Sequence, residues 1–379
     1  MLQLRLLAVL SFITFKVYAQ NATSFTPGKL WLDNKGVHIN AHGGGILLHN
    51  KIYYWFGEHK TAGEDGNNSN VGVHVYASKD LYNWKDEGIA LAMHDGTTSL
   101  FVKGCIVERP KVIYNALTKT FVMWFHHELK GQGYKAALTG LATSKNITGP
   151  YTYIKSVNPN AGYWPTNFPD SNKLPQSVDT TTKNINNKTP EGFQAIVNGY
   201  YVRRDFKKGQ MARDMTLFVD DDGKAYHIHS SESNQTLHIA ELTDDYQSFT
   251  GKYTRALPAK TNEAPALFKL NNKYYMFSSG TTGWNPNPAR LSVANHPMGP
   301  WQELGDPSRG TPEQNKTTFW SQSTHVLPIQ GKKNAFIFMG DRWTPKNAID
   351  GGYVWLPVQF ENGQPILKWF DTWNLSIFN

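Results

Sequence analysis

Apolar and polar residues alternate along most of the chain in short runs, and these runs come in pairs joined by a polar turn. The turns are rich in Asn, Asp and Gly, which tolerate the positive φ angles of tight hairpins. Runs of this length and period predict β-hairpins, and apolar residues with a helical spacing are almost absent. The five paired runs occupy residues 43–58, 109–126, 214–231, 264–280 and 323–341.

Further short runs with aromatic residues follow the hairpins and supply outer strands. They occupy residues 73–88, 139–154, 237–251, 290–304 and 353–375. One hairpin and one outer pair make a four-stranded blade, so five repeats predict an all-β, five-bladed β-propeller. A β-sandwich is the alternative for many short strands, but like hairpins roughly 50 to 100 residues apart suit blades with loop insertions better. The longest insertion spans 155–213, and its Tyr163-Trp164 pair is expected to form a wall of the binding pocket.

The first nineteen residues read as a cleaved secretory signal, with Arg5, an apolar stretch and Ala19 before the expected cleavage point. The apolar stretch is interrupted by Lys16 and is shorter than the ~20 residues that a membrane span needs, which disfavours an anchor. Residues 20–379 are therefore expected to form one propeller domain that is secreted or periplasmic, without a membrane partner.

Cysteine content and charge exclude several classes of protein. Cys105 is the only cysteine, so neither an intrachain disulfide nor a cysteine-rich zinc site can form. The net charge is +8, but the basic residues are scattered, which argues against nucleic acid as a partner. Seven N-x-S/T sequons can carry glycans if the host is eukaryotic. They begin at Asn21, Asn67, Asn146, Asn187, Asn234, Asn315 and Asn374.

The polar residues that open each repeat should meet at the propeller axis, where the innermost strands begin. Three of them, Glu108, Asp214 and Glu263, are carboxylates from different repeats. Converging like charges shift one another's pKa, which is unusual for a structural role. A protonated acid beside ionised groups is what glycoside hydrolysis requires.

Two motifs carry a specific resemblance. RDMTLFVDDDGKAYHIHSS and EAPALFKLNNKYYMFSSGTTGW resemble the third- and fourth-blade motifs of glycoside hydrolase family 43. The resemblance covers residues 27–379 and implies that Glu263 is the general acid, while Asp214 tunes that acid and orients the sugar.

The first blade departs from the usual family pattern, because Asn40 in INAHGGG stands near the position where most members place an Asp as general base. An amide side chain is not a general base. INAHGGG, VERPKVIYN, SQSTHV and MGDRW together resemble the exo-β-1,3-galactanase subgroup, which dispenses with that Asp. This resemblance implies that Glu108 and Gln322 surround the attacking water. Either Glu108 acts as base, or Gln322 positions the water and relays its proton through an amide tautomer.

The same resemblance implies further site residues. Trp284 is expected to stack on a sugar face. The candidates for substrate binding are Asn40, His42, Glu58, Tyr134, Thr281, Trp284 and Arg342. His42 and His325 are expected near the axis as core histidines; a calcium-linked site, as in some relatives, is the alternative, and no cofactor is expected to be required.

The expected activity is that of an inverting exo-glycosidase that releases galactose from β-1,3-galactan or the side chains of plant arabinogalactan. We expect the protein to be a monomer. An α-L-arabinofuranosidase, β-xylosidase or galactofuranosidase of the same family is the alternative enzyme. A sugar-binding propeller without catalysis is the alternative of another class, and retention of Glu263, Asp214 and Glu108 argues against it.

Overall fold

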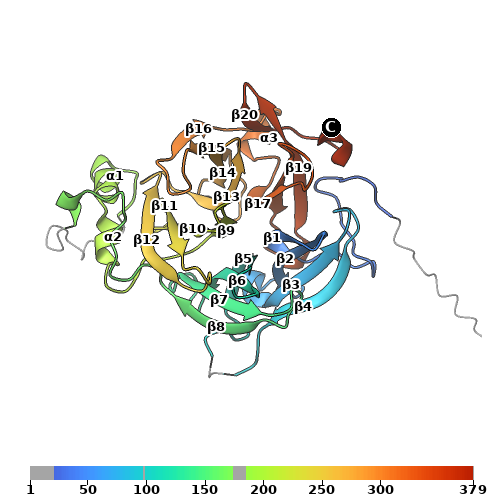
Figure 1. The fold of residues 1–379 in the computed structure, drawn as a ribbon, viewed down its shortest axis with the longest axis horizontal. Helices are drawn as coiled ribbons and strands as arrows, with labels where there is room; N and C mark the ends of the chain where they lie inside the picture. The colour runs from blue at the N-terminus through green and yellow to red at the C-terminus, as the bar shows by residue number, and fades with distance from the viewer. Residues whose placement is uncertain (1–20, 97–98, 174–184, 379) are drawn as a thin grey trace, which may run out of the picture.

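The computed structural model describes residues 21–96, 99–173 and 185–378. These residues form five four-stranded antiparallel sheets arranged as a ring around a central axis (Figure 1). The predicted five-bladed β-propeller is therefore confirmed. The predicted signal at residues 1–19 lies outside the described residues and stays a prediction. Among the described residues, no helix has the length and apolarity needed to cross a membrane.

Each blade follows the chain from its innermost to its outermost strand. Blade I holds β1 (His42–His49), β2 (Ile52–Lys60), β3 (Asn70–Ser78) and β4 (Lys85–Ala92). Blade II holds β5 (Ile106–Asn115), β6 (Thr120–Glu128), β7 (Leu138–Ser144) and β8 (Thr152–Val157). Blade III holds β9 (Met215–Val219), β10 (Ala225–Ser231), β11 (Thr236–Leu242) and β12 (Phe249–Ala256).

The last two blades follow the same order. Blade IV holds β13 (Glu263–Leu270), β14 (Lys273–Ser279), β15 (Ala289–Ala294) and β16 (Gln302–Gly305). Blade V holds β17 (Gln322–Pro328), β18 (Phe336–Arg342), β19 (Gly352–Glu361) and β20 (Gln364–Leu367). The helices of the described residues are α1 (Pro190–Val197), α2 (Tyr200–Arg204), α3 (Pro312–Lys316), and the 3₁₀ turns η1 (Gly66–Ser69), η2 (Asp170–Asn172), η3 (Ala348–Asp350) and η4 (Leu375–Phe378).

The ring is closed by the two ends of the propeller. The backbone N–H of Phe25 donates to the carbonyl of Trp373 at 2.7 Å, and the N–H of Trp373 donates back at 3.1 Å. The two rings stack with centroids 4.3 Å apart, and Trp355 packs beside them. This aromatic core joins blade V to blade I. Because this core buries a large aromatic surface, it can close the ring without a disulfide. Cys105 is a free, buried thiol.

The insertion between blades II and III covers the outer edge of blade III, where Figure 1 places α1 and α2 beside β12. The N–H of Thr166 donates to the carbonyl of Tyr253 in β12 at 2.7 Å. Trp164 stacks on Phe206 with ring centroids 4.0 Å apart. The expectation that Tyr163 and Trp164 line the pocket is therefore wrong. They help to protect a sheet edge that would otherwise expose unpaired backbone groups.

Candidate active site

The innermost strands bend where they enter the site. Strand register breaks between His42 and Gly45 in β1, between Glu108 and Lys111 in β5, and between Glu263 and Ala266 in β13. The residue after the first of each pair has a positive φ: 60° at position 43, 52° at position 109 and 55° at position 264. Such bulges re-aim side chains at the end of a strand. Blades I, II and IV thus use the same local device at the axis.

A pocket of about 180 Å³ opens at this end of the axis and takes residues from all five blades. The predicted catalytic residues Glu108, Asp214, Glu263 and Gln322 all line it. Its described lining residues are Glu58, Asn67, Glu108, Arg109, Tyr134, Asp214, Glu263, Gly283, Trp284, Gln322 and Trp343. The predicted convergence of three carboxylates on one axis is therefore present in the structure.

Glu263 is the carboxyl group that stays protonated. Burial and then the negative charge of Asp214 raise its pKa to about 8. Its Oε1 accepts a hydrogen bond of 2.6 Å from Nδ2 of Asn234. A carboxyl group with this pKa carries a proton at neutral pH and can deliver it to a leaving oxygen.

Asp214 and Gln322 are joined by one guanidinium group. Nε of Arg109 lies 2.8 Å from Oδ2 of Asp214, and Nη2 donates to Oε1 of Gln322 at 2.6 Å. The same Asp214 oxygen accepts the N–H of Ala264 at 3.1 Å. Arg213, the neighbour of Asp214 in the sequence, donates instead to the carbonyl of Tyr134.

Glu108 is held as an anion. Its Oε1 accepts hydrogen bonds from Nδ2 of Asn67 and, at 2.5 Å, from the hydroxyl of Tyr134. Its Oε2 lies 2.7 Å from Nδ1 of His126, whose Nε2 lies 2.9 Å from Glu128. Burial opposes ionisation of Glu108, but His126 and Tyr134 outweigh it and lower its pKa to about 2. Burial likewise opposes charge on His126, yet its two carboxylate partners raise its pKa to about 9.

The amide of Gln322 has a defined orientation. Its Oε1 accepts from Arg109 and, at 3.0 Å, from Nε1 of Trp343, while its Nε2 donates to Oγ of Ser279 at 2.9 Å. Guanidinium and indole N–H groups can only donate, so the oxygen must face Arg109 and Trp343. Both lone pairs of this carbonyl oxygen are therefore in use.

A layer of buried charge lies beneath the pocket. Oε1 of Glu58 accepts the N–H of Arg109 at 2.9 Å, and Oε2 pairs with Lys60 at 2.5 Å. Oδ2 of Asp341 accepts the N–H of Gly43 at 2.6 Å, and the carbonyl of Gly43 accepts from Nζ of Lys111 at 2.6 Å. Burial raises the pKa of Asp341 to about 7. Glu58 thus reaches the pocket as predicted, and it also anchors the backbone of Arg109.

Asn40 and His42 lie behind the pocket and do not line it. The side-chain amide of Asn40 donates to the carbonyl of Lys60 at 2.9 Å, and its backbone N–H donates to the hydroxyl of Tyr76. His42 is fully buried and stacks on Tyr353 with ring centroids 5.0 Å apart. Burial lowers its pKa well below the usual value, so it is a neutral core residue. An uncharged residue at position 40 therefore costs the pocket no carboxylate.

Four other predicted residues line pockets and grooves of the structure. Tyr134 and Trp284 line the pocket. Thr281 lines a separate surface pocket with Asn287 and Arg290. Arg342 lines a groove that adjoins the catalytic pocket. The structure does not bring Thr281 and Arg342 into contact with the three carboxylates.

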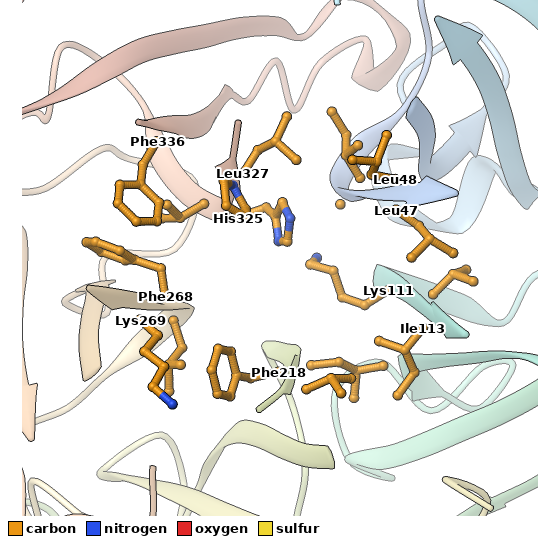
Figure 2. Close-up of a pocket in the computed structure, with 18 of the residues that line it drawn as sticks. Leu47, Leu48, Lys111, Ile113, Phe218, Phe268, Lys269, His325, Leu327 and Phe336 are labelled. Atoms are coloured by element: carbon orange, nitrogen blue, oxygen red, sulfur yellow. The ribbon is translucent and has the colours of Figure 1, made fainter. Parts of the chain in front are cut away.

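A larger cavity of about 540 Å³ occupies the opposite end of the axis (Figure 2). Its walls are mainly apolar, and the side chains of Lys111 and His325 point into its centre. Burial lowers the pKa of both groups, to about 7 and about 3. Asp221 is the single carboxylate among its described lining residues, and it pairs with Lys269 at 2.8 Å. The described lining of this cavity therefore lacks the pair of carboxyl groups that glycoside hydrolysis uses.

The described residues do not assemble a convincing cation site. Glu108, His126 and Asp214 bring possible ligand atoms within 4.8 Å of one another. However, His126 lies between two carboxylates as a cation, and Arg109 already neutralises Asp214. Calcium prefers a cage of oxygen ligands, whereas the charged neighbours that act on the pKa of His42 and His325 are basic: Lys60 and His38 for His42, and Lys111 for His325. These residues therefore do not fit the calcium alternative.

Several site residues were missed from the sequence because they come from other strands and loops. They are Asn67, Arg109 as a bridging group, His126, Asn234, Asp341 and Trp343. Asn67 and Asn234 were noticed only as sequons, yet the amide nitrogen of each is engaged by a catalytic carboxylate. The motif MGDRW contains both Asp341 and Trp343, and was the one local signal that pointed to them.

Comparison with known proteins gives one consistent answer. The family model of glycosyl hydrolases family 43 matches residues 193–342. A family 43 β-1,3-galactosidase solved with galactodeoxynojirimycin is 51% identical, with a TM-score of 0.87 over 93% of this chain and 100% of that one. An exo-β-1,3-galactanase of Phanerochaete chrysosporium solved with β-1,3-galactotriose is 31% identical, with a TM-score of 0.73 over 93% of this chain and 68% of that one.

A β-D-galactofuranosidase of Aspergillus niger is 34% identical over 115 residues, which are 30% of this chain and 33% of that protein. The match thus spans about one third of the length of this curated relative. The 51% identity to the β-1,3-galactosidase over 93% of this chain, together with the fold and the three axial carboxylates, shows that the chain is a glycoside hydrolase and belongs to family 43.

Proposed function

We propose that this protein is an inverting, exo-acting β-1,3-galactosidase that releases terminal galactose from β-1,3-galactan, including the side chains of plant arabinogalactan. The observation that carries the proposal is that two carboxyl groups of the pocket have opposite protonation states. Glu263 has a pKa of about 8 and holds a proton, whereas Glu108 has a pKa of about 2 and is an anion. The solved relatives that are named as β-1,3-galactosidase and exo-β-1,3-galactanase support the choice of sugar and linkage.

Glu263 protonates the glycosidic oxygen as the bond breaks. Burial and the charge of Asp214 keep its proton in place until the leaving group needs it. Asn234 fixes Oε1 through its hydrogen bond, which leaves Oε2 as the atom that delivers the proton. Asp214 and Glu108 supply negative charge that stabilises the oxocarbenium-like transition state.

The attacking water is held by Glu108 and Gln322. An ionised carboxylate offers about four lone-pair sites, and three are taken by Asn67, Tyr134 and His126. One site on Oε2 therefore remains for a proton of the water. The carbonyl oxygen of Gln322 has no such vacancy, but one N–H of its amide remains to donate to the water oxygen. Glu108 is thus the proposed base, and Gln322 the group that positions the water.

The shape of the site supports the proposed exo action. The pocket is small and has walls from every blade, so it suits the end of a galactan chain better than its middle. In an inverting enzyme the acid and the base are separated by roughly 6.5–9.5 Å, which leaves space for the water. Secretion, which is inferred from the signal-like residues 1–19, and a monomeric state complete the proposal.

The first test is product release from β-1,3-galactan by the wild type and by Glu263→Gln, followed by NMR. The wild type should release α-galactose first, and Glu263→Gln should lose this activity. Glu191→Gln is the matched control, because Glu191 is exposed on α1 outside the ring. Release of β-galactose as the first anomer, or full activity in Glu263→Gln, would contradict the proposed mechanism.

The base is tested with Glu108→Gln and Gln322→Ala. Removing a general base should lower kcat by about 10²–10⁴-fold, and azide should restore turnover in Glu108→Gln with galactosyl azide as product. If Glu108→Gln retains most of its activity while Gln322→Ala loses it, a relay through the Gln322 amide replaces this scheme.

Galactofuranoside hydrolysis is the second candidate, because of the partial match to the fungal β-D-galactofuranosidase. Assays with an aryl galactofuranoside, arabinofuranoside and galactopyranoside separate the sugars. Cleavage of the galactofuranoside alone would keep the fold and the acid but replace the substrate.

A further inference from the structure

Two tryptophans of this chain stand out by their exposure. The chain has twelve tryptophans, and all twelve lie among the described residues. Only Trp284 and Trp320 are exposed, by 40% and 45%. Both side chains line the same groove between blades IV and V. Two large aromatic rings exposed at one place mark a binding surface more often than chance packing does.

The groove is continuous with the catalytic pocket. It has a volume of about 290 Å³ and shares Gly283, Trp284, Gln322 and Trp343 with that pocket. Trp284 and Trp343 meet edge to face, with ring centroids 5.9 Å apart. A ligand seated in the pocket can therefore extend into the groove without crossing a wall.

The backbone around Trp320 is held in an unfavourable conformation. Thr318, Phe319 and Trp320 have successive φ values of 49°, 55° and 58°, a left-handed turn that bulky residues seldom adopt. Phe319 is completely buried, and its carbonyl accepts a hydrogen bond of 3.0 Å from Nη2 of Arg342. Such strain persists only where the surroundings enforce it, and it occurs at functional sites. In this conformation the indole ring of Trp320 faces outward, while the phenyl ring of Phe319 is buried.

The two segments that carry the exposed rings are tied together. Oγ1 of Thr318 donates to the carbonyl of Asn287 at 2.7 Å. The side chain of Asn287 in turn accepts the N–H of Gly280 at 2.7 Å and donates to Thr282 at 2.8 Å, which braces the loop that bears Trp284. The groove is therefore preorganised, and little ordering cost remains for a ligand.

We propose that this groove is a second sugar-binding subsite, in which Trp320 stacks on a pyranose ring of the oligosaccharide whose terminal galactose occupies the catalytic pocket. The proposal deepens the proposed galactosidase function and rests on it. Indole faces match the apolar faces of sugar rings, while Arg342 and Asn285 in the lining offer polar groups to hydroxyls. The second sugar is either the next unit of the β-1,3-linked backbone or a branch on the bound galactose.

Kinetics with Trp320→Ala test the subsite. The substrates are an aryl β-galactoside, linear β-1,3-galactotriose and a β-1,3-galactobiose with a β-1,6-linked galactose on its terminal unit. We expect kcat/KM for the aryl galactoside to stay unchanged and kcat/KM for one oligosaccharide to fall about tenfold. A fall with the linear triose assigns a backbone sugar, and a fall with the branched substrate assigns a branch. If kcat/KM of Trp320→Ala equals that of the wild type on all three substrates, or falls by the same factor on all three, the subsite is refuted.

Two further variants separate stacking from structure. Trp320→Phe keeps an aromatic face and should recover most of the lost kcat/KM. Tyr163→Ala removes another exposed aromatic ring, 53% exposed on the insertion beside blade III, and should match the wild type on every substrate. Failure of Trp320→Phe to recover activity would argue against stacking.

Binding without turnover distinguishes this proposal from the proposed function. In the Glu263→Gln background, calorimetry with β-1,3-galactotriose and the branched substrate should show about tenfold weaker binding of one of them after Trp320→Ala. If the wild type cleaves neither oligosaccharide but this weakening is seen, the subsite stands and the activity fails. If neither oligosaccharide binds, or Trp320→Ala leaves both affinities unchanged, the subsite is refuted.

Discussion

Arg109 donates a 2.6 Å hydrogen bond from Nη2 to the side-chain oxygen of Gln322, and this contact links blade II to blade V across the active site. The same guanidinium holds Asp214 through Nε and the carbonyl of Ser323 through Nη1. Only a planar group with several fixed donors can hold three partners in this way. The positions of the residues beside the acid and beside the water therefore depend on one side chain.

We expect Arg109→Lys to lower kcat/KM by about 10²-fold, because a lysine supplies the charge but not the fork of donors. The melting temperature should fall less than in Arg109→Met, which leaves Asp214 without a cation. Kinetics on galacto-oligosaccharides and thermal unfolding check both expectations. An Arg109→Lys variant with wild-type kcat/KM would show that Gln322 and Asp214 hold their places without this bridge.

The pH profile should report the acid directly. With a pKa of about 8 for Glu263, kcat/KM should decline as the pH rises through that value, because the acid then loses its proton. The negative charge of Asp214 contributes to this raised pKa, so Asp214→Asn should move the alkaline limb to lower pH as well as reduce kcat. An unchanged limb in Asp214→Asn would mean that burial alone sets the pKa of Glu263.

The fold and the three carboxylates of the site could be predicted from the sequence, and the reason is physical. Hairpins with polar turns repeat along the chain, and Glu108, Asp214 and Glu263 stand at equivalent points of three repeats, so local order already places them at one axis. Their partners carry no such local signal. His126 lies opposite Glu108 on the second strand of the blade II hairpin, whereas Asn67 from a 3₁₀ turn and Asn234 from a hairpin turn each reach a carboxylate of the next blade.

Sequence order does not show which of two neighbouring residues faces the site. Arg213 precedes Asp214 in the sequence, but the structure pairs Asp214 with Arg109 from the adjacent blade. Within MGDRW, Asp341 turns toward Gly43 beneath the pocket, while the next residue, Arg342, lines the adjoining groove. Local sequence order cannot show which of two adjacent side chains a strand end or bulge turns inward.

Stability should depend on pH through the contact of Glu108 with His126. The folded-state pKa of Glu108 is depressed to about 2, so its stabilisation is present above its usual pKa and is lost as the pH falls toward 2. That of His126 is raised to about 9, so its stabilisation is complete below its usual pKa and is lost as the pH rises through 9. The two effects overlap in the mildly acidic range between the usual pKa values of the two groups.

We therefore expect His126→Gln to lower the melting temperature most in that mildly acidic range, and progressively less as the pH approaches 9. Removing one member of a buried charged set typically costs about 3–5 kcal/mol. Thermal unfolding of wild type and variant across the pH range measures the difference. If the difference in melting temperature between wild type and variant does not vary with pH, the lost stability comes from packing and not from charge.

Gly43 should tolerate no side chain. Its φ is +60°, its N–H binds Asp341 and its carbonyl binds Lys111, and a Cβ at this position would overlap Oε1 of Glu58. Gly36 is a matched control, because its φ is +75° but a Cβ there meets nothing within 4 Å. Both Ala variants incur the cost of a left-handed backbone, about 1–2 kcal/mol.

Gly43→Ala should in addition displace Glu58 and the backbone of Arg109, so its melting temperature should fall further than that of Gly36→Ala and kcat/KM should fall only at position 43. Equal effects of the two substitutions on stability and activity would show that Gly43 is required for its φ angle alone, and not for the close approach of Glu58 beneath the pocket.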